Sequence, residues 1–396
     1  MASPSVSPIL NSLAAAGQDY ENNKPGSRES LIKLSRMLIS ELDIPSEFIQ
    51  QRLWAEMILS GILRLSVDIK LLPLLKEAGD AGLTLPALAE KTGMDVAILQ
   101  RLARHLVTMN VIQYQNGAFH ATRLSNGLAE PRYQDSISYT YDVARPAFAA
   151  YPEYFKYHSS EHLDAHSGPF QYGHNTDLPF FEWLVATPPS LQLFDSLMTG
   201  YRAGKVNWCE RGFYPVSERL VDCFDSSVSD VFLVDIGGGV GHDLRILATQ
   251  HAHLPGKLVL QDRDAVIAKV TPEDRECFEA QVHDFFTPQP VMHARAYYLH
   301  SILHDWRDDD AVRILKNLAP ALKPGYSRVL LNEIVVDEEA PALPATIMDM
   351  MMLSHLAAKE RTEGDWRAVL EDAGLNIVNV YKYPGVAESV IEAELA

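Results

Sequence analysis

A buried strand that runs into four closely spaced glycines constrains the fold of this chain more than any other segment. Residues Val231–Gln250 read VFLVDIGGGVGHDLRILATQ, in which an apolar strand ends near Asp235 and a helix begins at about His242. Glycines such as Gly237 and Gly239 let a backbone turn sharply and approach a ligand, because they have no Cβ atom. In open parallel sheets such turns lie at the carboxyl ends of strands, where ligands bind. The segment therefore predicts a parallel α/β sheet with a ligand site after this strand.

The C-terminal half continues this alternation of strands and helices. Apolar strand candidates are KLVLQD, ARAYYLH and SRVLLNEIVV, with a weaker one at Asn376–Tyr381 and a last one near Glu388–Glu394. Helices are expected between them at His242–Gln250, Asp308–Leu318 and Gly364–Ala373. Strands that alternate with helices are typical of a doubly wound, mostly parallel sheet.

The N-terminal half is dominated by helical spacing of apolar residues. A winged helix-turn-helix is predicted from helices at Pro86–Thr92 and Asp95–Met109 and a hairpin that turns at Asn116-Gly117. Earlier helices are expected at Ile49–Leu63 and Asp68–Glu77. We expect four parts: a loose arm (residues 1–29), a winged-helix domain (30–130), a helical layer rich in aromatic residues that could line a flat substrate (131–225), and the α/β domain (226–396).

The charge balance argues against the DNA binding that a winged helix suggests. The chain has 34 basic and 52 acidic residues, a net charge of −18. The helix that would enter a major groove offers only Arg101, Arg104 and His105, whereas DNA-binding surfaces carry clustered Lys and Arg. The winged helix is therefore interpreted as a dimerisation domain, and neither nucleic acid nor an anionic membrane is expected as a partner.

The sequence also predicts the cellular compartment. Cys209, Cys223 and Cys277 are dispersed and form no CxxC pair, so neither a disulfide framework nor a zinc site is indicated. The N-terminus lacks the features of a secretory signal, and no apolar run reaches the roughly 18 residues of a membrane span. We expect a cytoplasmic protein.

Two acidic residues after the glycine turn are candidates for a cofactor site. Asp262 ends the next strand, 25 residues after Gly237, a spacing at which an acid accepts hydrogen bonds from ribose hydroxyls. Asp284 and Phe285 follow where an acid and an aromatic ring could hold the amino edge and the face of an adenine. Either acid alone is more often a helix cap or a surface group. Their order after the glycine turn favours the cofactor roles.

With these features the chain resembles the plant-type class I S-adenosylmethionine-dependent O-methyltransferases, in their fungal secondary-metabolism branch. The resemblance runs from about residue 30 to the end and rests on LVDIGGGVG, ILHDWRDDDAVRIL, LKPGYSRVLLNE and AKERTEGDW, in that order. It implies a Rossmann-like methyltransferase sheet, an N-terminal all-helical winged-helix dimerisation domain, and a homodimer. It also implies S-adenosylmethionine as the cofactor, with a site at Asp235, Gly237, Gly239, Asp262, Asp284 and Phe285.

The resemblance implies the catalytic residues as well. The histidine of the ILHDW block, His304, matches the family's general base, and Glu333 and Glu360 match two glutamates that flank it. The expected reaction is methyl transfer to a hydroxyl of a small phenolic or polyketide-type metabolite. A phenol has a pKa of about 10, so at neutral pH it needs a positioned base.

The two glutamates are expected to act through the histidine. Glu333 is predicted to accept a hydrogen bond from the second imidazole nitrogen, and Glu360 to do the same from another side. A structural salt bridge is the alternative for both glutamates. Arg361 is a possible partner for some other acid.

Substrate identity does not follow from the resemblance, because several positions differ. Phe194 and Met198 match the family's aromatic residue and methionine, but Ser301 replaces a tryptophan. His300 replaces a lysine that contacts the cofactor in plant members, and its imidazole is kept as a cofactor-binding candidate. Met351 is a candidate wall of the substrate site, although methionine runs are more often core packing.

The same residues suggest three other functions. His300 and His304 stand four apart, but a zinc protease motif has glutamate after its first histidine, and that position is Ser301. The acidic run at residues 308–310 is interpreted as a helix start, and no metal is predicted. A non-methylating reaction on the same fold, such as a dehydration or pericyclic rearrangement, remains open. A regulatory DNA- or protein-binding module is disfavoured by the acidic charge and the complete catalytic set.

Overall fold

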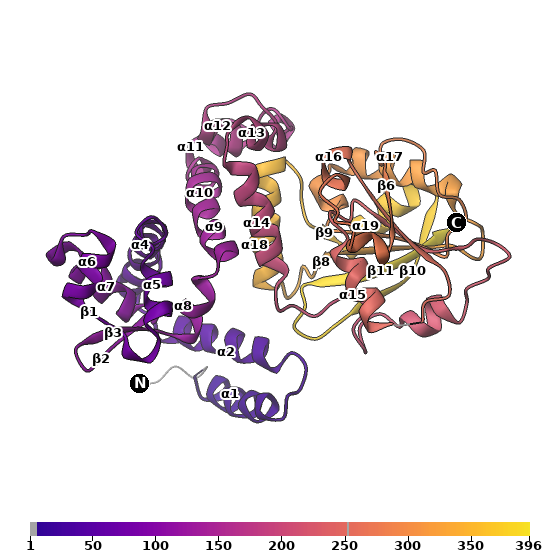
Figure 1. Cartoon of the computed structure of the whole chain (residues 1–396). Coiled ribbons are helices and arrows are strands. Elements are labelled where there is room, and N and C mark those ends of the chain that lie inside the picture. The colour runs from indigo at the N-terminus through magenta and orange to yellow at the C-terminus, as the bar shows by residue number, and fades with distance from the viewer. Residues whose placement is uncertain (1–5, 252) are drawn as a thin grey trace. The chain divides into compact units, whose positions relative to one another are not determined.

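The structure is a computed structural model that describes residues 6–251 and 253–396 (Figure 1). The chain divides into a mainly helical unit that contains Leu34–Gly204 and an α/β unit that contains Lys205–Ala396. Two N-terminal helices, α1 (Val6–Glu21) and α2 (Ser27–Leu42), are shared between the units, since Ser12–Lys33 groups with the second. Among the described helices, none has the length and apolar character that crossing a bilayer requires.

The α/β unit is built on one twisted sheet. Its strands are β4 (Val231–Ile236), β5 (Lys257–Asp262), β6 (Glu279–Val282), β7 (Ala296–His300), β8 (Arg328–Val336), β9 (Arg361–Thr362), β10 (Leu375–Lys382) and β11 (Glu388–Leu395). Their order is β10-β11-β8-β7-β4-β5-β6, with β9 paired to β8. The pairs from β8 to β6 are parallel, whereas β11 and β10 join antiparallel at one edge. The predicted doubly wound sheet is confirmed.

Helices cover both faces of this sheet because its central strands are apolar on both sides. Successive strand residues point to opposite faces, so Tyr297 packs with α17 (Asp308–Leu318) and α19 (Glu363–Asp372), whereas Tyr298 packs with α15 (His242–Gln250). The bounds of α15 and α17 are those that the sequence predicts. Figure 1 shows these helices around the sheet.

The strand order places the candidate catalytic groups together. It reverses at β4, because β5 and β6 lie on one side of that strand and β7 and β8 on the other. Ligands of open α/β sheets bind at such a switch point, outside the carboxyl ends of the strands. The glycine turn follows β4 and the His304 segment follows β7, so both lie at this edge.

The helical unit contains the predicted winged helix, built from α6 (Leu85–Thr92), α7 (Val96–Thr108) and a hairpin of β2 (Ile112–Gln115) and β3 (Ala118–Ala121). A short β1 (Leu83–Thr84) adds a third strand beside β3. The turn at Asn116 and Gly117 has positive φ at both residues, as a tight hairpin requires.

A helical layer follows the winged helix in the same unit. Its longer helices are α8 (Arg123–Leu128), α9 (Pro131–Tyr139), α11 (Tyr151–Tyr157), α12 (Pro169–His174), α13 (Phe180–Ala186) and α14 (Ser190–Arg202). Helices α9 and α14 pack along each other, and Ser196 Oγ of α14 donates a hydrogen bond of 2.7 Å to the Asp135 carboxylate of α9.

Several local predictions are wrong. The arm expected over residues 1–29 is helical from Val6, and only its first five residues lie outside the described part. The helix expected at Ile49–Leu63 is divided into a π-helical segment, η1 (Ile49–Ala55), and α4 (Glu56–Asp68), after a short α3 (Pro45–Phe48). Strand β6 and helix α18 (Leu343–Leu356) were not predicted. The four-part division of the chain stays a prediction.

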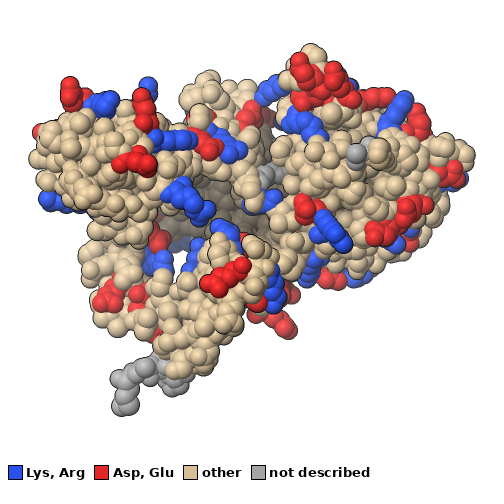
Figure 2. Space-filling model, turned by 60° about the horizontal axis from the view of Figure 1, so that its bottom comes forward, with Lys and Arg blue, Asp and Glu red and all other residues tan. Residues whose placement is uncertain are grey.

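Charged side chains of both signs are mixed on the surface. On the face shown in Figure 2, Lys and Arg are interspersed with Asp and Glu. A DNA-binding surface instead concentrates basic residues on one face. This pattern agrees with the negative net charge in disfavouring a nucleic acid partner.

The buried carboxylate of Glu392 in β11 generates a stability prediction. It accepts hydrogen bonds from Arg219 (2.6 Å), Arg328 (3.1 Å) and the Tyr381 hydroxyl (3.2 Å). We expect Glu392→Ala to lower the free energy of unfolding by about 3–5 kcal/mol, because two partly buried guanidinium groups lose their counter-charge. The matched control is Glu394→Ala on the same strand, a 37% exposed partner of Arg328, which should cost less than about 1 kcal/mol. Equal losses in urea unfolding would contradict this account.

Candidate active site

The glycine turn after β4 leaves backbone open to a ligand. Gly237 and Gly239 have φ of +73° and +61°, a region that side chains rarely adopt. A Cβ on Gly237 would lie 2.6 Å from Ile302 Cδ1, so the turn packs closely against the segment after β7. A Cβ on Gly239 would meet nothing within 4 Å. The peptide at Gly239 therefore borders open space.

Asp262 closes the turn from the end of β5. Its Oδ2 accepts the Gly239 N–H at 2.9 Å, and its Oδ1 accepts the Arg263 N–H at 2.7 Å. Burial raises the pKa of Asp262, while these two N–H groups act in the opposite direction. Each carboxylate oxygen keeps a second lone pair for a hydroxyl donor. The acid and the open turn together fit the ribose of an adenosyl group.

Two of the other predicted cofactor residues, Asp235 and Phe285, lie against the same turn. Asp235 is fully buried in β4, and its carboxylate occupies the space that a side chain on Gly238 would need. Asp284 Oδ1 accepts the Phe286 N–H at 2.9 Å, and the ring of Phe285 lies 5.9 Å from that of Trp306. The structure thus gives Asp284 a turn-capping contact as well as a place beside an aromatic ring.

His300 at the end of β7 belongs to a polar network that the sequence did not predict. Its Nδ1 lies 2.8 Å from Asp243 Oδ2 and 3.0 Å from the Tyr298 hydroxyl. Tyr298 in turn accepts a hydrogen bond of 3.0 Å from Asn332. Asp243 lies in the first turn of α15, directly after the glycines. The imidazole of His300 is therefore anchored to α15, the helix that follows the glycine turn.

His304 lies in a short 3₁₀ turn, η7 (Leu303–Asp305), and is nearly buried. Its Nδ1 is 2.8 Å from Glu360 Oε1, and because a carboxylate only accepts, Nδ1 carries the hydrogen. Its Nε2 lies 3.5 Å from Asp305 Oδ1, at ion-pair distance. The predicted pairing of His304 with Glu360 is present, and it leaves Nε2 for a proton transfer.

Glu333 does not play the part expected from the sequence. Its Oε1 accepts the backbone N–H groups of Ile302 (3.0 Å) and Leu303 (2.8 Å) rather than an imidazole hydrogen. These two residues directly precede His304, so Glu333 caps the turn that carries the histidine. The prediction of a Glu333–imidazole hydrogen bond is wrong, because the Glu333 carboxylate of β8 meets the backbone N–H groups of this turn and not the histidine ring.

Arg361 holds the same turn from β9. Its buried guanidinium donates to the Leu303 carbonyl, the Trp306 carbonyl and Asp308 Oδ1, each at 2.8 Å. Asp308 is thus the other acid that the sequence suggested for Arg361. On the neighbouring residue, the Glu360 N–H donates to Asp349 Oδ1 of α18 at 2.9 Å. Asp349 and Arg361 were not predicted as site residues, since nothing in the sequence pairs them with this turn.

The carboxylates around His304 control its protonation. Burial opposes the charged imidazole, but Asp305, Glu360 and Glu333 outweigh it and raise the pKa of His304 to about 10. Burial also raises the pKa of Asp305 to about 6 and that of Glu333 to about 7. At neutral pH the imidazole is therefore the doubly protonated cation. Its pKa of about 10 is close to that of a phenol.

The predicted substrate residues lie in both units. In the helical unit, the Phe194 ring of α14 packs 5.6 Å from Phe180 and 5.8 Å from Tyr139, and Met198 is partly exposed one turn later. In the α/β unit, Met351 of α18 is half-buried. Their role as substrate contacts stays a prediction.

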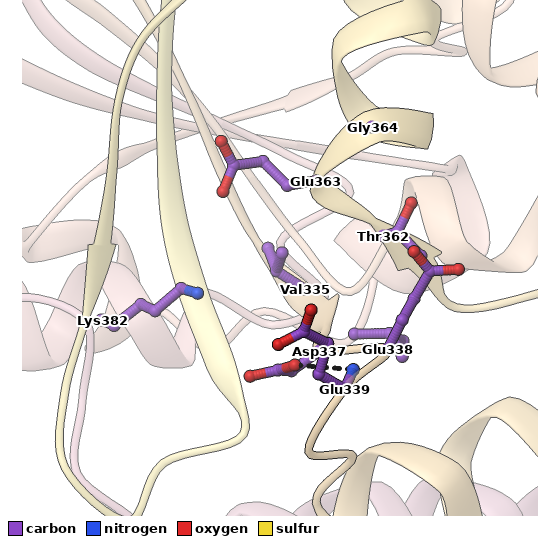
Figure 3. Close-up of a pocket in the computed structure, with 9 residues that line it drawn as sticks. Val335, Asp337, Glu338, Glu339, Thr362, Glu363, Gly364 and Lys382 are labelled. Atoms are coloured by element: carbon purple, nitrogen blue, oxygen red, sulfur yellow. Dashed lines mark hydrogen bonds between the residues drawn. The ribbon is translucent and has the colours of Figure 1, made fainter.

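A separate hollow at the carboxyl end of β8 is lined by acids and is not the catalytic site. Figure 3 shows Asp337, Glu338 and Glu339 after β8, Glu363 at the start of α19 and Lys382 of β10 around it. Such a rim favours cations over a phenolate. Over residues 6–251 and 253–396, no set of three His, Cys, Asp or Glu side chains is arranged to hold a metal ion.

Two family models match separate parts of the chain. Residues 52–131 match the O-methyltransferase dimerisation domain, and residues 216–376 match the O-methyltransferase domain. The chain is 56% identical to the O-methyltransferase mpaG' of Penicillium brevicompactum over 398 aligned residues, which cover 100% of both chains. A solved structure of LepI in complex with SAM is 25% identical, with a TM-score of 0.87 over 98% of this chain and 99% of that one. A structure described as a pericyclic reaction enzyme, 24% identical and with a TM-score of 0.87 over 98% and 100%, shares the fold.

The charge environment of His304 generates a pH prediction. Because the imidazole must lose its proton before it can accept one, kcat/KM for a phenol should rise with pH towards about 10. Glu360→Gln removes a negative charge that stabilises the imidazolium. The rise of kcat/KM should therefore occur at lower pH in this variant than in the wild type. The substrate's own titration is the same in both enzymes and cannot cause the shift.

Glu363→Gln is the matched control for this measurement. It makes the same chemical change at an exposed acid three residues along the chain, and its pH limb should stay with that of the wild type. Coincident limbs for the wild type and Glu360→Gln would contradict the proposed coupling.

Proposed function

The chain belongs to the S-adenosylmethionine-dependent O-methyltransferase family of fungal secondary metabolism, and on that premise we propose that His304 is its general base toward a phenolic or polyketide-type hydroxyl. The observation that carries this proposal is the 2.8 Å contact between His304 Nδ1 and Glu360 Oε1. It orients the ring and leaves Nε2 to receive the acceptor's proton.

The residues around the glycine turn are proposed to hold the cofactor. Asp262 would accept hydrogen bonds from ribose hydroxyls, and Asp284 and Phe285 would bind the adenine. The turn at Gly237 and Gly239, with buried Asp235 below it and His300 beside it, would contact the remainder. When bound, S-adenosylmethionine supplies an electrophilic methyl group on a sulfonium sulfur.

The chain's own residues then have separate tasks. His304 Nε2 takes the hydroxyl proton, and the Glu360 carboxylate stabilises the imidazolium that results. Glu333 and Arg361 keep the turn at Leu303 in place, so that the imidazole does not have to reorganise during the reaction. Phe194, Met198 and Met351 are proposed to contact the acceptor.

A non-methylating reaction on the same fold is the competing function. The shared fold with a pericyclic reaction enzyme does not favour it, because a fold hosts many chemistries. The complete His304–Glu360 pair supports proton removal from a hydroxyl, which methyl transfer to oxygen needs.

The proposed function is tested with methyl-labelled S-adenosylmethionine and three acceptors: orcinol, orsellinic acid and m-cresol. We expect label in an aryl methyl ether, and a rate lower by about 10²–10⁴ for His304→Ala, because the base is lost. Cofactor affinity, measured by calorimetry, should be unchanged in the variant. Acceptor conversion without label transfer would contradict methyl transfer, and an unchanged rate in His304→Ala would contradict its role as base.

We also propose that the protein is a homodimer formed through its N-terminal helices. Large apolar side chains of η1 and α4 are exposed in the single chain, with Trp54 at 58% and Met57 at 70%. Exposed apolar patches of this kind mark interfaces. Trp54 and Met57 both fall within residues 52–131, which match the dimerisation domain.

Light scattering after size exclusion tests the dimer. The double variant Trp54→Ser, Met57→Ser should be monomeric at low micromolar concentration, because apolar area at the interface is lost. Val185→Ser is the control, since it removes an equally exposed apolar side chain of α13 outside the matched segment. A double variant that remains dimeric would rule out this surface.

A further inference from the structure

Trp208 differs from Trp366, which is also deeply buried, in the bonding of its indole N–H. Trp366 Nε1 donates a hydrogen bond of 3.1 Å to the Ile334 carbonyl. Trp208 is only 2% exposed, yet within the described part of the chain its buried Nε1 has no acceptor. Buried tryptophans usually pair this group, because leaving a buried donor unpaired costs free energy. The free protein therefore holds a buried donor whose partner is still to be identified.

Aromatic stacking places Trp208 beside the polar network at the glycine turn. Its ring centre lies 4.6 Å from that of Tyr298 in β7, with 27° between the two planes. The Tyr298 hydroxyl lies 3.0 Å from His300 Nδ1 and 3.5 Å from Oδ2 of Asp243, a residue in the first turn of α15. Trp208 also belongs to the same apolar cluster as Leu244 of that turn. The indole is therefore part of the α/β unit and close to the helix that follows the glycines.

The strand order indicates which part of the cofactor comes near Trp208. Asp262 and Phe285, the candidates for the ribose and the adenine, follow β5 and β6 on one side of β4. Tyr298 and His300 lie in β7, on the other side of β4. Ligands of such sheets lie across the carboxyl ends of the strands. A cofactor that is held by its adenosine at β5 and β6 therefore directs its amino-acid end across the glycine turn towards β7.

The amino-acid end of S-adenosylmethionine carries a group that an indole N–H can bind. Its carboxylate offers only acceptor atoms, and the indole Nε1–H is only a donor. A hydrogen bond to a charged acceptor is stronger than one between neutral groups. Stacking on Tyr298 already fixes the indole, so little side-chain freedom is lost when the bond forms.

We propose that Trp208 Nε1 donates a hydrogen bond to the carboxylate in the amino-acid part of S-adenosylmethionine. The proposal rests on the proposed function, since it concerns the cofactor of that reaction. It makes Trp208 a residue that distinguishes the intact cofactor from adenosine derivatives that lack the amino acid. Trp208 takes no part in removing the acceptor's proton.

The test measures by calorimetry the affinity of the protein for S-adenosylhomocysteine and for 5′-methylthioadenosine, which lacks the amino-acid part. Two variants remove the N–H: Trp208→Phe, and the replacement of Trp208 with 3-benzothienylalanine, which keeps the size of the indole but has sulfur in place of N–H. We expect Kd for S-adenosylhomocysteine to rise roughly 10- to 100-fold in both, the value of one hydrogen bond to a charged group. Kd for 5′-methylthioadenosine should stay the same, because it has no carboxylate to lose.

The same 3-benzothienylalanine replacement at Trp366 is the matched control. The Trp366 N–H has the Ile334 carbonyl as its partner, so the melting temperature should fall while both affinities stay constant. Unchanged affinity for S-adenosylhomocysteine in the Trp208 variants, as when a water satisfies the indole, overturns the proposal and leaves the proposed function intact. Equal weakening of both ligands also overturns it, because Trp208 then acts only through the packing of the site. A wild-type protein that binds neither ligand overturns both the proposal and the proposed function.

Discussion

The buried contact between His304 and Glu360 is the interaction on which the catalytic edge of the sheet depends. Removing an imidazolium and a carboxylate from water is costly, and their attraction repays that cost only where the geometry is good and other polar contacts complete it. Here Asp305 and Glu333 add negative charge, Glu333 and Arg361 fix the turn beneath the histidine, and Asp349 fixes the peptide of Glu360. The position of His304 therefore depends on two kinds of contact. Glu333 of β8 and Arg361 of β9 hold the backbone before it, and Glu360 holds its ring.

The fold was predictable where burial and local pattern agree. Strands β4, β5, β7 and β8 are apolar runs because both of their faces are covered, and α15 and α17 begin and end at the predicted residues. Strand β6 was missed because it lies at the sheet edge and its segment EAQV is half polar. Helix α18 was missed because it is apolar on all sides and shows no stripe of helical period. The segment of helix α1 was predicted to be a loose arm because residues 1–27 are rich in Ser, Gly, Asn and Pro.

The parts of the site that depend on single sequence motifs could be predicted. The glycine turn and Asp262 meet as expected, since parallel strands bring their carboxyl ends to one edge. The pairing of His304 with Glu360 also follows the resemblance. The task of Glu333, the clamp of Arg361 and the anchoring of His300 by Asp243 depend on which atoms of distant segments face one another. The sequence analysis names Glu333, Arg361 and His300 but not Asp243, and it contains no signal for the distances between these side chains.

The protonation state of each ring nitrogen of His304 shows whether Glu360 holds Nδ1. Nitrogen-15 NMR of histidine-labelled protein, with His304→Ala to assign its signals, reports the hydrogen on each ring nitrogen separately. We expect both nitrogens of His304 to be protonated at about pH 8, and only Nε2 to lose its hydrogen as the pH passes about 10. A ring that is neutral at about pH 8 with its hydrogen on Nε2 would contradict the account, because Glu360 would then not hold Nδ1.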